Sequence, residues 1–163
     1  MAFFPSKLSR VGLVAALGLF ATAGCGGGSA TPDATGMLSS CDTETRAPKY
    51  MPNFSVTSNS GAFTAVLVES VPGPPVRYTN DWTVRILDAS GNPVSGLAFT
   101  ALPKMPDHTH PTNVVPVVTD KGGGVYDLSP VYLFMPGYWT VTLTLPLASG
   151  GTDDVVFPVC IPS

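Results

Sequence analysis

The residues best suited to chemistry lie in one seven-residue stretch, Met105-Pro106-Asp107-His108-Thr109-His110-Pro111, which holds both histidines of the 163-residue chain. If this segment is extended, His108 and His110 share a face and both imidazoles could reach one ion. Imidazole suits copper, zinc and nickel, whereas a thioether selects for Cu(I), so the neighbouring Met105 favours copper. Asp107 is a further candidate, either as a ligand or as the partner that holds one imidazole tautomer. The stretch therefore predicts a copper site.

The same stretch has a purely structural interpretation. Two prolines bracket it, which is typical of a surface loop, and its histidines would then be solvated while the methionine fills a gap in the core. A pH-sensitive contact through the two histidines is a third option. The residues alone leave these alternatives open.

Other patterns argue against catalysis. A catalytic triad would need a nucleophile near His108 or His110, and the sequence has no Gly-x-Ser-x-Gly element, so we expect no enzyme. Gly122-Gly123-Gly124 lacks the Lys-Ser or Lys-Thr of a phosphate loop and predicts a turn. Trp82 and Trp139 lie in clean alternation and are expected in the core rather than on a binding platform.

Composition narrows the class of protein. Only 12% of the residues are charged, the formal net charge is -3, and the eight Lys and Arg residues are scattered, which argues against a nucleic-acid partner. Seventeen Gly and seventeen Pro interrupt any long helical pattern, and frequent Val and Thr favour strands.

The first residues predict export. Lys7 and Arg10 precede an apolar run, Val11 to Ala23, that is too short to span a bilayer as a helix, so residues 1–24 are predicted to be a signal peptide. Ala23-Gly24-Cys25 resembles the end of a bacterial lipobox, which implies that Cys25 carries the lipid that holds the protein on a bilayer. Residues 25–40, rich in Gly, Ser and Thr, are predicted to be a flexible tether.

The residue that follows the lipidated cysteine bears on sorting between membranes. Gly26 rather than Asp at this position resembles lipoproteins sent to the outer membrane. We therefore expect the protein to be lipid-anchored in the bacterial cell envelope, at the outer membrane, with a plain secreted or membrane-retained form as the alternative.

Two further cysteines remain in the predicted domain, residues 41–163. In an oxidising compartment Cys41 and Cys160 are expected to form a disulfide that joins the first segment of the domain to its last strand. Such a bridge stabilises by roughly 4 to 5 kcal/mol in the chain-entropy model. The alternative is that one of them is a metal ligand.

The domain predicts an all-β fold. Trp139, Val141 and Leu143 alternate with threonines, which indicates a strand with one buried face. Strands are predicted at Phe63 to Glu69, Asp81 to Asp88, Val94 to Leu102, Val114 to Val118, Gly124 to Leu128, Tyr138 to Leu145 and Thr152 to Cys160. About seven short strands suit an immunoglobulin-like antiparallel β-sandwich.

Several motifs recur in an order that is similar to a known family. They are Asn80-Asp81-Trp82-Thr83-Val84, Asp88-Ala89-Ser90-Gly91-Asn92-Pro93-Val94, Met105-Pro106 with a following His, Gly124-Val125-Tyr126 and Phe134-Met135-Pro136-Gly137-Tyr138-Trp139. Over roughly Phe63 to Cys160 the chain resembles YtkA-like domains, which look like relatives of FixH-type and CopC-like sandwiches.

The resemblance implies an exported or membrane-anchored sandwich, some of whose relatives occur in copper-related settings. Met105, His110 and Met135 match recurring Met and His positions, and His108 stands where many members have Met. This exchange favours a mixed or Cu(II) site. Two hypotheses result: a copper-binding or copper-relaying lipoprotein, or a structural module that docks onto another envelope protein without a metal.

Overall fold

The computed structural model describes residues 41–108 and 111–163. The predicted signal peptide (1–24), the predicted tether (25–40), the predicted lipidation site Cys25 and His110 lie outside the described residues. In the part that is described, no helix has the length and apolar character needed to cross a membrane.

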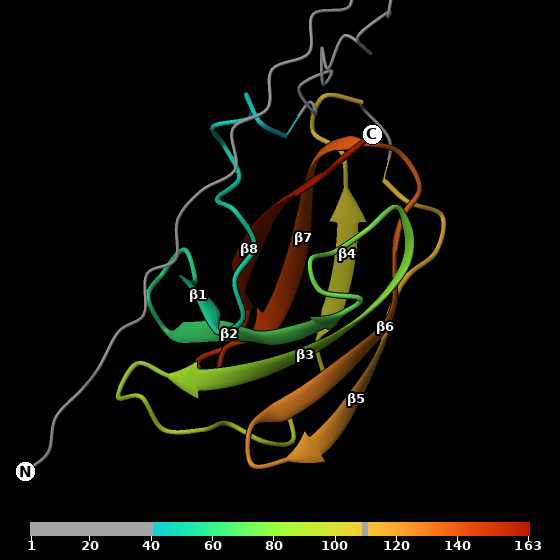
Figure 1. Cartoon of the computed structure of the whole chain (residues 1–163). Coiled ribbons are helices and arrows are strands. Elements are labelled where there is room, and N and C mark those ends of the chain that lie inside the picture. Colours follow the sequence, from blue (N-terminus) through green and yellow to red (C-terminus); the bar gives the residue numbers. More distant parts are fainter. Residues whose placement is uncertain (1–40, 109–110) are drawn as a thin grey trace, which may run out of the picture. The chain divides into compact units, whose positions relative to one another are not determined.

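The described chain folds into strands joined by turns and loops (Figure 1). The strands are β1 (Phe54–Thr57), β2 (Phe63–Val71), β3 (Tyr78–Asp88), β4 (Thr100–Lys104), β5 (Val117–Gly122), β6 (Val125–Leu133), β7 (Gly137–Pro146) and β8 (Thr152–Ile161). The predicted all-β class is confirmed, with eight strands in the described residues instead of about seven.

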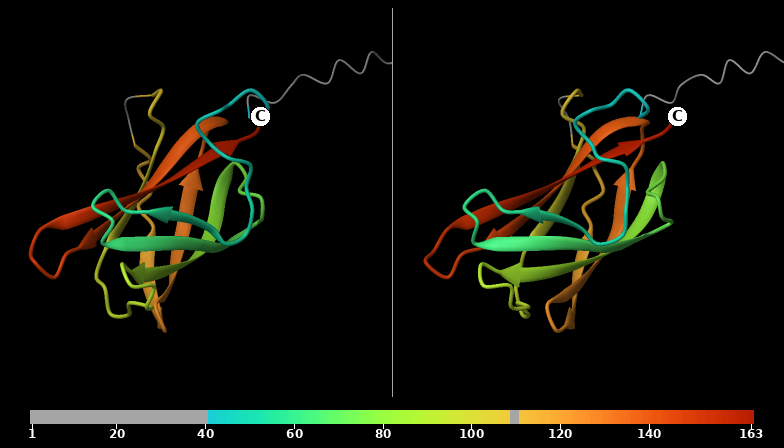
Figure 2. Two further views of the ribbon diagram at one scale, coloured as in Figure 1. Left: turned by 90° about the vertical axis from the view of Figure 1, so that its left-hand side faces the viewer. Right: turned by 60° about the vertical axis from the view of Figure 1, so that its left-hand side comes forward.

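Two antiparallel sheets make up the sandwich. A five-stranded sheet has the order β1-β2-β3-β6-β5, and a three-stranded sheet has the order β4-β7-β8. Buried side chains of the two sheets form one hydrophobic core, and Figure 2 gives two further views of the strands around it. Burial of this apolar area is the main favourable term in the stability of the fold.

Alternation of side chains explains which face of each strand is buried. Trp82, Val84 and Ile86 point inward from β3 with at most 1% exposure, as predicted. The inward residues of β7 behave alike, since Trp139, Val141, Leu143 and Leu145 are fully buried. Both sequence patterns thus locate the core correctly, because neighbouring strand residues point to opposite faces.

Two strand predictions were wrong in part, and one strand was not predicted. Val94 to Leu102 was predicted as one strand, but β4 begins only at Thr100, because Gly96 has a φ of 76° that interrupts the extended backbone. Val114 to Val118 was predicted as another, but β5 begins at Val117, after Pro116, which has no backbone N–H for a ladder. The sequence also missed β1, a four-residue edge strand.

The predicted disulfide is confirmed. Cys41 and Cys160 are bonded across 119 positions of sequence, with their Cα atoms 5.6 Å apart. Cys160 lies near the end of β8, where it pairs with Tyr138 of β7. The bridge therefore fixes the first described residue to the sheet that holds the buried tryptophan of β7.

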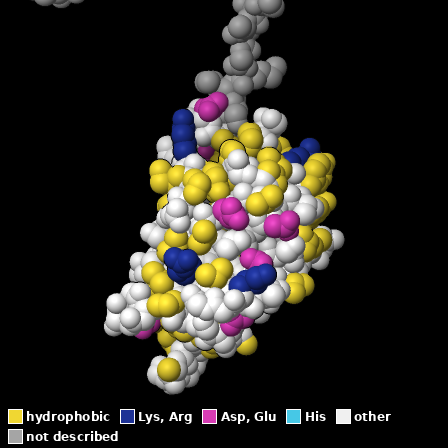
Figure 3. Space-filling model, turned by 60° about the horizontal axis from the view of Figure 1, so that its bottom comes forward, with side chains coloured by type: hydrophobic (Ala, Val, Ile, Leu, Met, Phe, Trp, Pro, Cys, Tyr) yellow, Lys and Arg dark blue, Asp and Glu magenta, His cyan; other side chains and the backbone are white. Residues whose placement is uncertain are grey.

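Figure 3 shows one face of the molecule, on which acidic and basic side chains are interspersed with hydrophobic ones. No continuous basic patch is visible on this face, which agrees with the scattered positions of Lys and Arg in the sequence.

Candidate functional site

A short loop between β4 and β5 carries the predicted metal ligands other than Met135. Its ends are held together, since Lys104 pairs with Pro111 in an isolated bridge and the Thr112 amide donates to the Pro103 carbonyl oxygen at 3.2 Å. We call residues 105–110 the Met/His loop. The loop therefore starts and ends at a pinned base, at the end of the edge strand β4.

The loop begins with a turn, not with a continued strand. The His108 amide donates to the Met105 carbonyl oxygen at 3.1 Å, and Pro106 occupies the second position, which its fixed φ favours. The extended segment on which the prediction placed His108 and His110 on one face is thus absent up to His108. The His108 side chain is exposed, and His110 is outside the described residues.

Met105 differs sharply from its histidine neighbour. Its side chain is only 2% exposed and belongs to the hydrophobic core. It packs so closely on β7 that a Cβ added to Gly137 would lie 3.0 Å from its Cε. Met105 therefore anchors the loop to the core, as the structural alternative predicts for a methionine, and the thioether is shielded from solvent.

Met135 lies in the turn before β7 and reaches the same end of the sandwich. Pairing of β4 with β7 runs from Thr100 opposite Thr144 to Lys104 opposite Thr140, which brings the turn beside the Met/His loop. The Met135 side chain is half-buried against the core, and its carbonyl oxygen accepts a 2.9 Å hydrogen bond from Trp139 Nε1. The two predicted methionines thus flank β7 at one end.

Arg46 is the residue at this end that sequence reasoning missed. Its Nη1 and Nη2 donate to the two carboxylate oxygens of Asp107 at 2.7 Å each, and Nε and Nη2 also bind Glu44. The guanidinium carbon lies 4.1 Å from the centre of the Tyr138 ring. Arg46 therefore clamps the loop to the N-terminal segment and to β7 through bidentate and cation–π contacts.

The clamp sets the charge state of Asp107. Hydrogen bonds from Arg46 lower the pKa of the Asp107 and Glu44 carboxyl groups and raise the pKa of Arg46. Both oxygens of Asp107 already accept hydrogen bonds from the guanidinium, so the expected ligand or tautomer-holding role of Asp107 is not what its contacts support. No sequence signal indicated Arg46, because it lies 61 positions before Asp107.

Few side chains of the described residues are placed to act as metal ligands. Within residues 41–108 and 111–163, no three His, Cys, Asp or Glu side chains are arranged to hold an ion. Cys41 and Cys160 are in a disulfide, which removes both thiols from any ligand set. What remains of the predicted ligands is His108, the half-buried Met135 and the core residue Met105.

Comparison with known proteins gives one family. The model of the YtkA-like family matches residues 57–144, which include β2 to β6, the Met/His loop and most of β7. No curated protein and no solved structure matches the chain. The matched residues make up more than half of the 163-residue chain, and the chain therefore belongs to the YtkA-like family.

Proposed function

We propose that this protein is an envelope-anchored binding domain that holds or relays a copper ion through His108 and His110. It is a binding protein and not an enzyme. The observation that carries the proposal is the pinned base of the Met/His loop, formed by the bridge between Lys104 and Pro111.

The sequence spacing limits how far the two histidines can separate. Residues two apart in sequence have Cα atoms within about 7 Å of each other in any conformation. Two imidazoles at this spacing can therefore share one ion, and the bridge between Lys104 and Pro111 keeps the loop that carries them short. Imidazole nitrogens bind Cu(II) well, and copper is the tightest binder among the divalent first-row metals.

The two methionines have different parts in this proposal. Met105 supports the loop from within the core, because its side chain is 2% exposed. Met135 is half-buried beside the loop and is the thioether that could join the histidines. A site dominated by imidazole favours Cu(II) over Cu(I), since thioethers are what select for Cu(I).

Anchoring is proposed to come from lipid on Cys25. The sequence that supports it is the signal segment followed by Ala23-Gly24-Cys25, and these residues lie outside the described part of the chain. Metabolic labelling with a palmitate analogue should mark the wild-type protein and leave Cys25→Ser unlabelled. Equal labelling of both proteins would contradict the anchor.

Copper binding is tested by titrating the purified protein with Cu(II), and then with Cu(I), against a competing chelator. We expect one ion per chain with a Kd below about 1 μM, lost in the His108→Ala/His110→Ala double variant. Asn113→Ala is the matched control, because Asn113 is exposed just beyond the loop and offers no imidazole. Equal weak binding by all three proteins would overturn the proposal.

A second candidate is the protein-interaction module without a metal. It is supported by β5, an edge strand of the five-stranded sheet whose Val117 is 66% exposed, with Val115 58% exposed just before it. Exposed apolar edges are sites where partner strands add. In this case Val117→Lys would abolish capture of an envelope partner, and the double histidine variant would not.

A further inference from the structure

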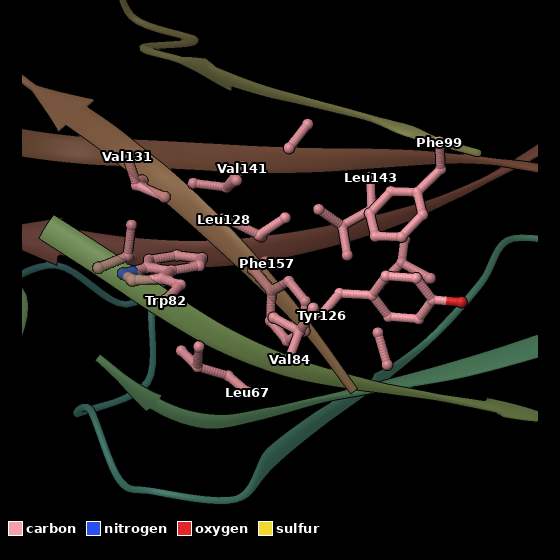
Figure 4. Close-up of a cluster of buried hydrophobic side chains, with 14 of the residues drawn as sticks. Leu67, Trp82, Val84, Phe99, Tyr126, Leu128, Val131, Val141, Leu143 and Phe157 are labelled. Carbon is pink, nitrogen blue, oxygen red and sulfur yellow. The ribbon is translucent and has the colours of Figure 1, made fainter. Parts of the chain in front are cut away.

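The guanidinium of Arg46 lies between the Met/His loop and the smaller sheet. Its carbon is 4.1 Å from the centre of the Tyr138 ring, which β7 carries on the face opposite to its buried residues. Two of those buried residues, Val141 and Leu143, are labelled in the core cluster of Figure 4. Tyr138 also pairs with Cys160 of β8. The surface on which the guanidinium rests is therefore part of the sheet and not of the loop.

The chain on both sides of Arg46 is fixed to the domain. Cys41, five positions before Arg46, is bonded to Cys160. Tyr50, four positions after Arg46, accepts a 2.9 Å hydrogen bond at its hydroxyl from the Ser70 amide. A segment that is fixed at both ends loses less conformational entropy when a residue between them makes a contact. The guanidinium is therefore preorganised for its partners.

Arg46 holds both carboxylate oxygens of Asp107. Its Nη1 donates to Oδ1 and its Nη2 to Oδ2, at 2.7 Å each, which is the bidentate geometry that matches a guanidinium to a carboxylate. The two side chains are 47% and 50% exposed, and an ion pair with so much solvent around it adds little to the stability of a fold. The pair therefore positions two functional groups more than it stabilises the domain.

Asp107 is the carboxylate that directly precedes His108. Neighbouring Cα atoms are about 3.8 Å apart, so this carboxylate and the next imidazole can reach one ion. Hydrogen bonds from Arg46 lower the pKa of Asp107, and the nearby charge of His108 lowers it further, so the two side chains lie within electrostatic reach of each other. Carboxylate oxygen and imidazole nitrogen together suit Cu(II). Arg46 is what keeps Asp107 out of such a ligand set.

We infer that Arg46 competes with the copper ion for Asp107, and that this competition makes the site release its ion readily. The inference rests on the copper binding proposed above, and it selects relay over storage. Two effects act in the same direction. The ion gains Asp107 as a ligand only when the pair with Arg46 breaks, and the positive charge of the guanidinium repels a cation bound beside it.

The first test removes the guanidinium. Breaking an exposed ion pair changes an equilibrium constant by at most about fivefold, and loss of the adjacent positive charge adds to this, so Arg46→Gln should bind Cu(II) about five- to tenfold more tightly than the wild-type protein. Titration against a competing chelator measures the two Kd values. Lys49→Gln is the matched control, because it removes the same charge from an exposed position of the same segment, and its Kd should equal that of the wild-type protein.

The second test asks whether the gain passes through Asp107. Adding Asp107→Asn to the Arg46→Gln variant should cancel the gain in affinity, because the released carboxylate is then missing. Electron paramagnetic resonance of bound Cu(II) separates ligation from charge. The spectrum should differ between the wild-type protein and Arg46→Gln, since an oxygen ligand is added, and should be the same for Asp107→Asn with and without Arg46→Gln.

A third measurement needs no metal. In the ¹⁵N–¹H spectrum of the labelled protein without copper, Asp107→Asn should move the Arg46 Nε–H signal toward that of free arginine, because the guanidinium loses its bidentate partner.

The outcomes separate this inference from the proposed function. Equal weak copper binding by the wild-type protein and the double histidine variant overturns both. If the wild-type protein binds copper through its histidines, the inference alone is overturned by an Arg46→Gln variant that binds no more tightly, by a gain that survives Asp107→Asn, or by an Arg46 signal that does not move.

Discussion

Trp82 of β3 and Trp139 of β7 are both buried in the core, one from each sheet, but their indole N–H groups have different contacts. Both are at most 1% exposed, and each packs edge-on against a phenylalanine, Phe157 for Trp82 and Phe134 for Trp139. Trp139 Nε1 donates to the Met135 carbonyl oxygen at 2.9 Å, whereas Trp82 Nε1 has no partner among the described residues. The two tryptophans are therefore equally buried, but only the indole N–H of Trp139 has a hydrogen bond among the described residues.

The difference arises from the loops and not from the strands. The turn before β7 folds back so that its carbonyl group reaches the indole of Trp139. The chain near Trp82 instead leaves a cavity between the N-terminal segment and β3. A buried indole N–H in a strand thus depends on a nearby loop for its partner, and among the described residues only that of Trp139 has one.

The largest expected effect comes from removing the disulfide, which forms part of the wall near Trp82. A Cys41→Ala/Cys160→Ala variant should lose up to about 4 to 5 kcal/mol of unfolding free energy, because the bridge closes a long loop. Urea unfolding measures this loss. The Trp82 Nε1–H signal should shift more than that of Trp139, because Cys41, Cys160 and Trp82 line the same cavity, and the reverse order would contradict this local effect.

Gly137→Ala tests the region of Trp139. Gly137 has a φ of 121°, which side chains rarely adopt, and an added Cβ would lie 3.0 Å from Met105 Cε. We expect a loss of about 1 to 3 kcal/mol in unfolding free energy. Gly61→Ala is the control, because it also has a positive φ but meets nothing within 4 Å. A loss no greater than the control's would show that the Met105 contact is unimportant.

The two tryptophans can be compared directly by replacing each with Phe. Both variants lose the same side-chain volume, but only Trp139→Phe breaks a hydrogen bond. Trp139→Phe should therefore be less stable than Trp82→Phe by about 1 kcal/mol in urea unfolding. Equal losses would mean that the indole of Trp82 has a hydrogen bond of the same strength in solution.

The smallest effect concerns pH and the Arg46 clamp beside Tyr138. Hydrogen bonds from Arg46 lower the pKa of Asp107 in the folded state, so its contribution is present above the unfolded pKa of about 4 and is lost as pH falls below that value. Asp107→Asn should be slightly less stable at pH 7 and should lose less stability between pH 5 and pH 2. Parallel curves for both proteins in urea unfolding would exclude the clamp as a source of acid sensitivity.

Much of the fold was predictable because alternation is a local signal. The inward residues of β3 and β7 were read directly from the sequence, and the pairing of Cys41 with Cys160 followed from an even number of remaining cysteines. The start of β4 was misplaced because a positive φ at Gly96 depends on its surroundings as well as on its residue type.

The candidate site was less predictable. The sequence could group Met105 with His108, but it could not show that a turn buries one side chain and exposes the other. Arg46 was missed because its bond to Asp107 spans 61 positions without a local pattern. The unpartnered indole N–H of Trp82 could not be predicted either, because the alternation of apolar residues indicates burial and not hydrogen bonding.

The disulfide also determines how the domain bears mechanical load. A pull that reaches Cys41 from the preceding chain passes through the bridge to Cys160, near the end of β8. It then acts along a strand that pairs with β7 over ten residues. Without the bridge the same pull would reach β1, an edge strand of four residues. The covalent link thus directs tension away from the shortest ladder and into the longest one of the smaller sheet.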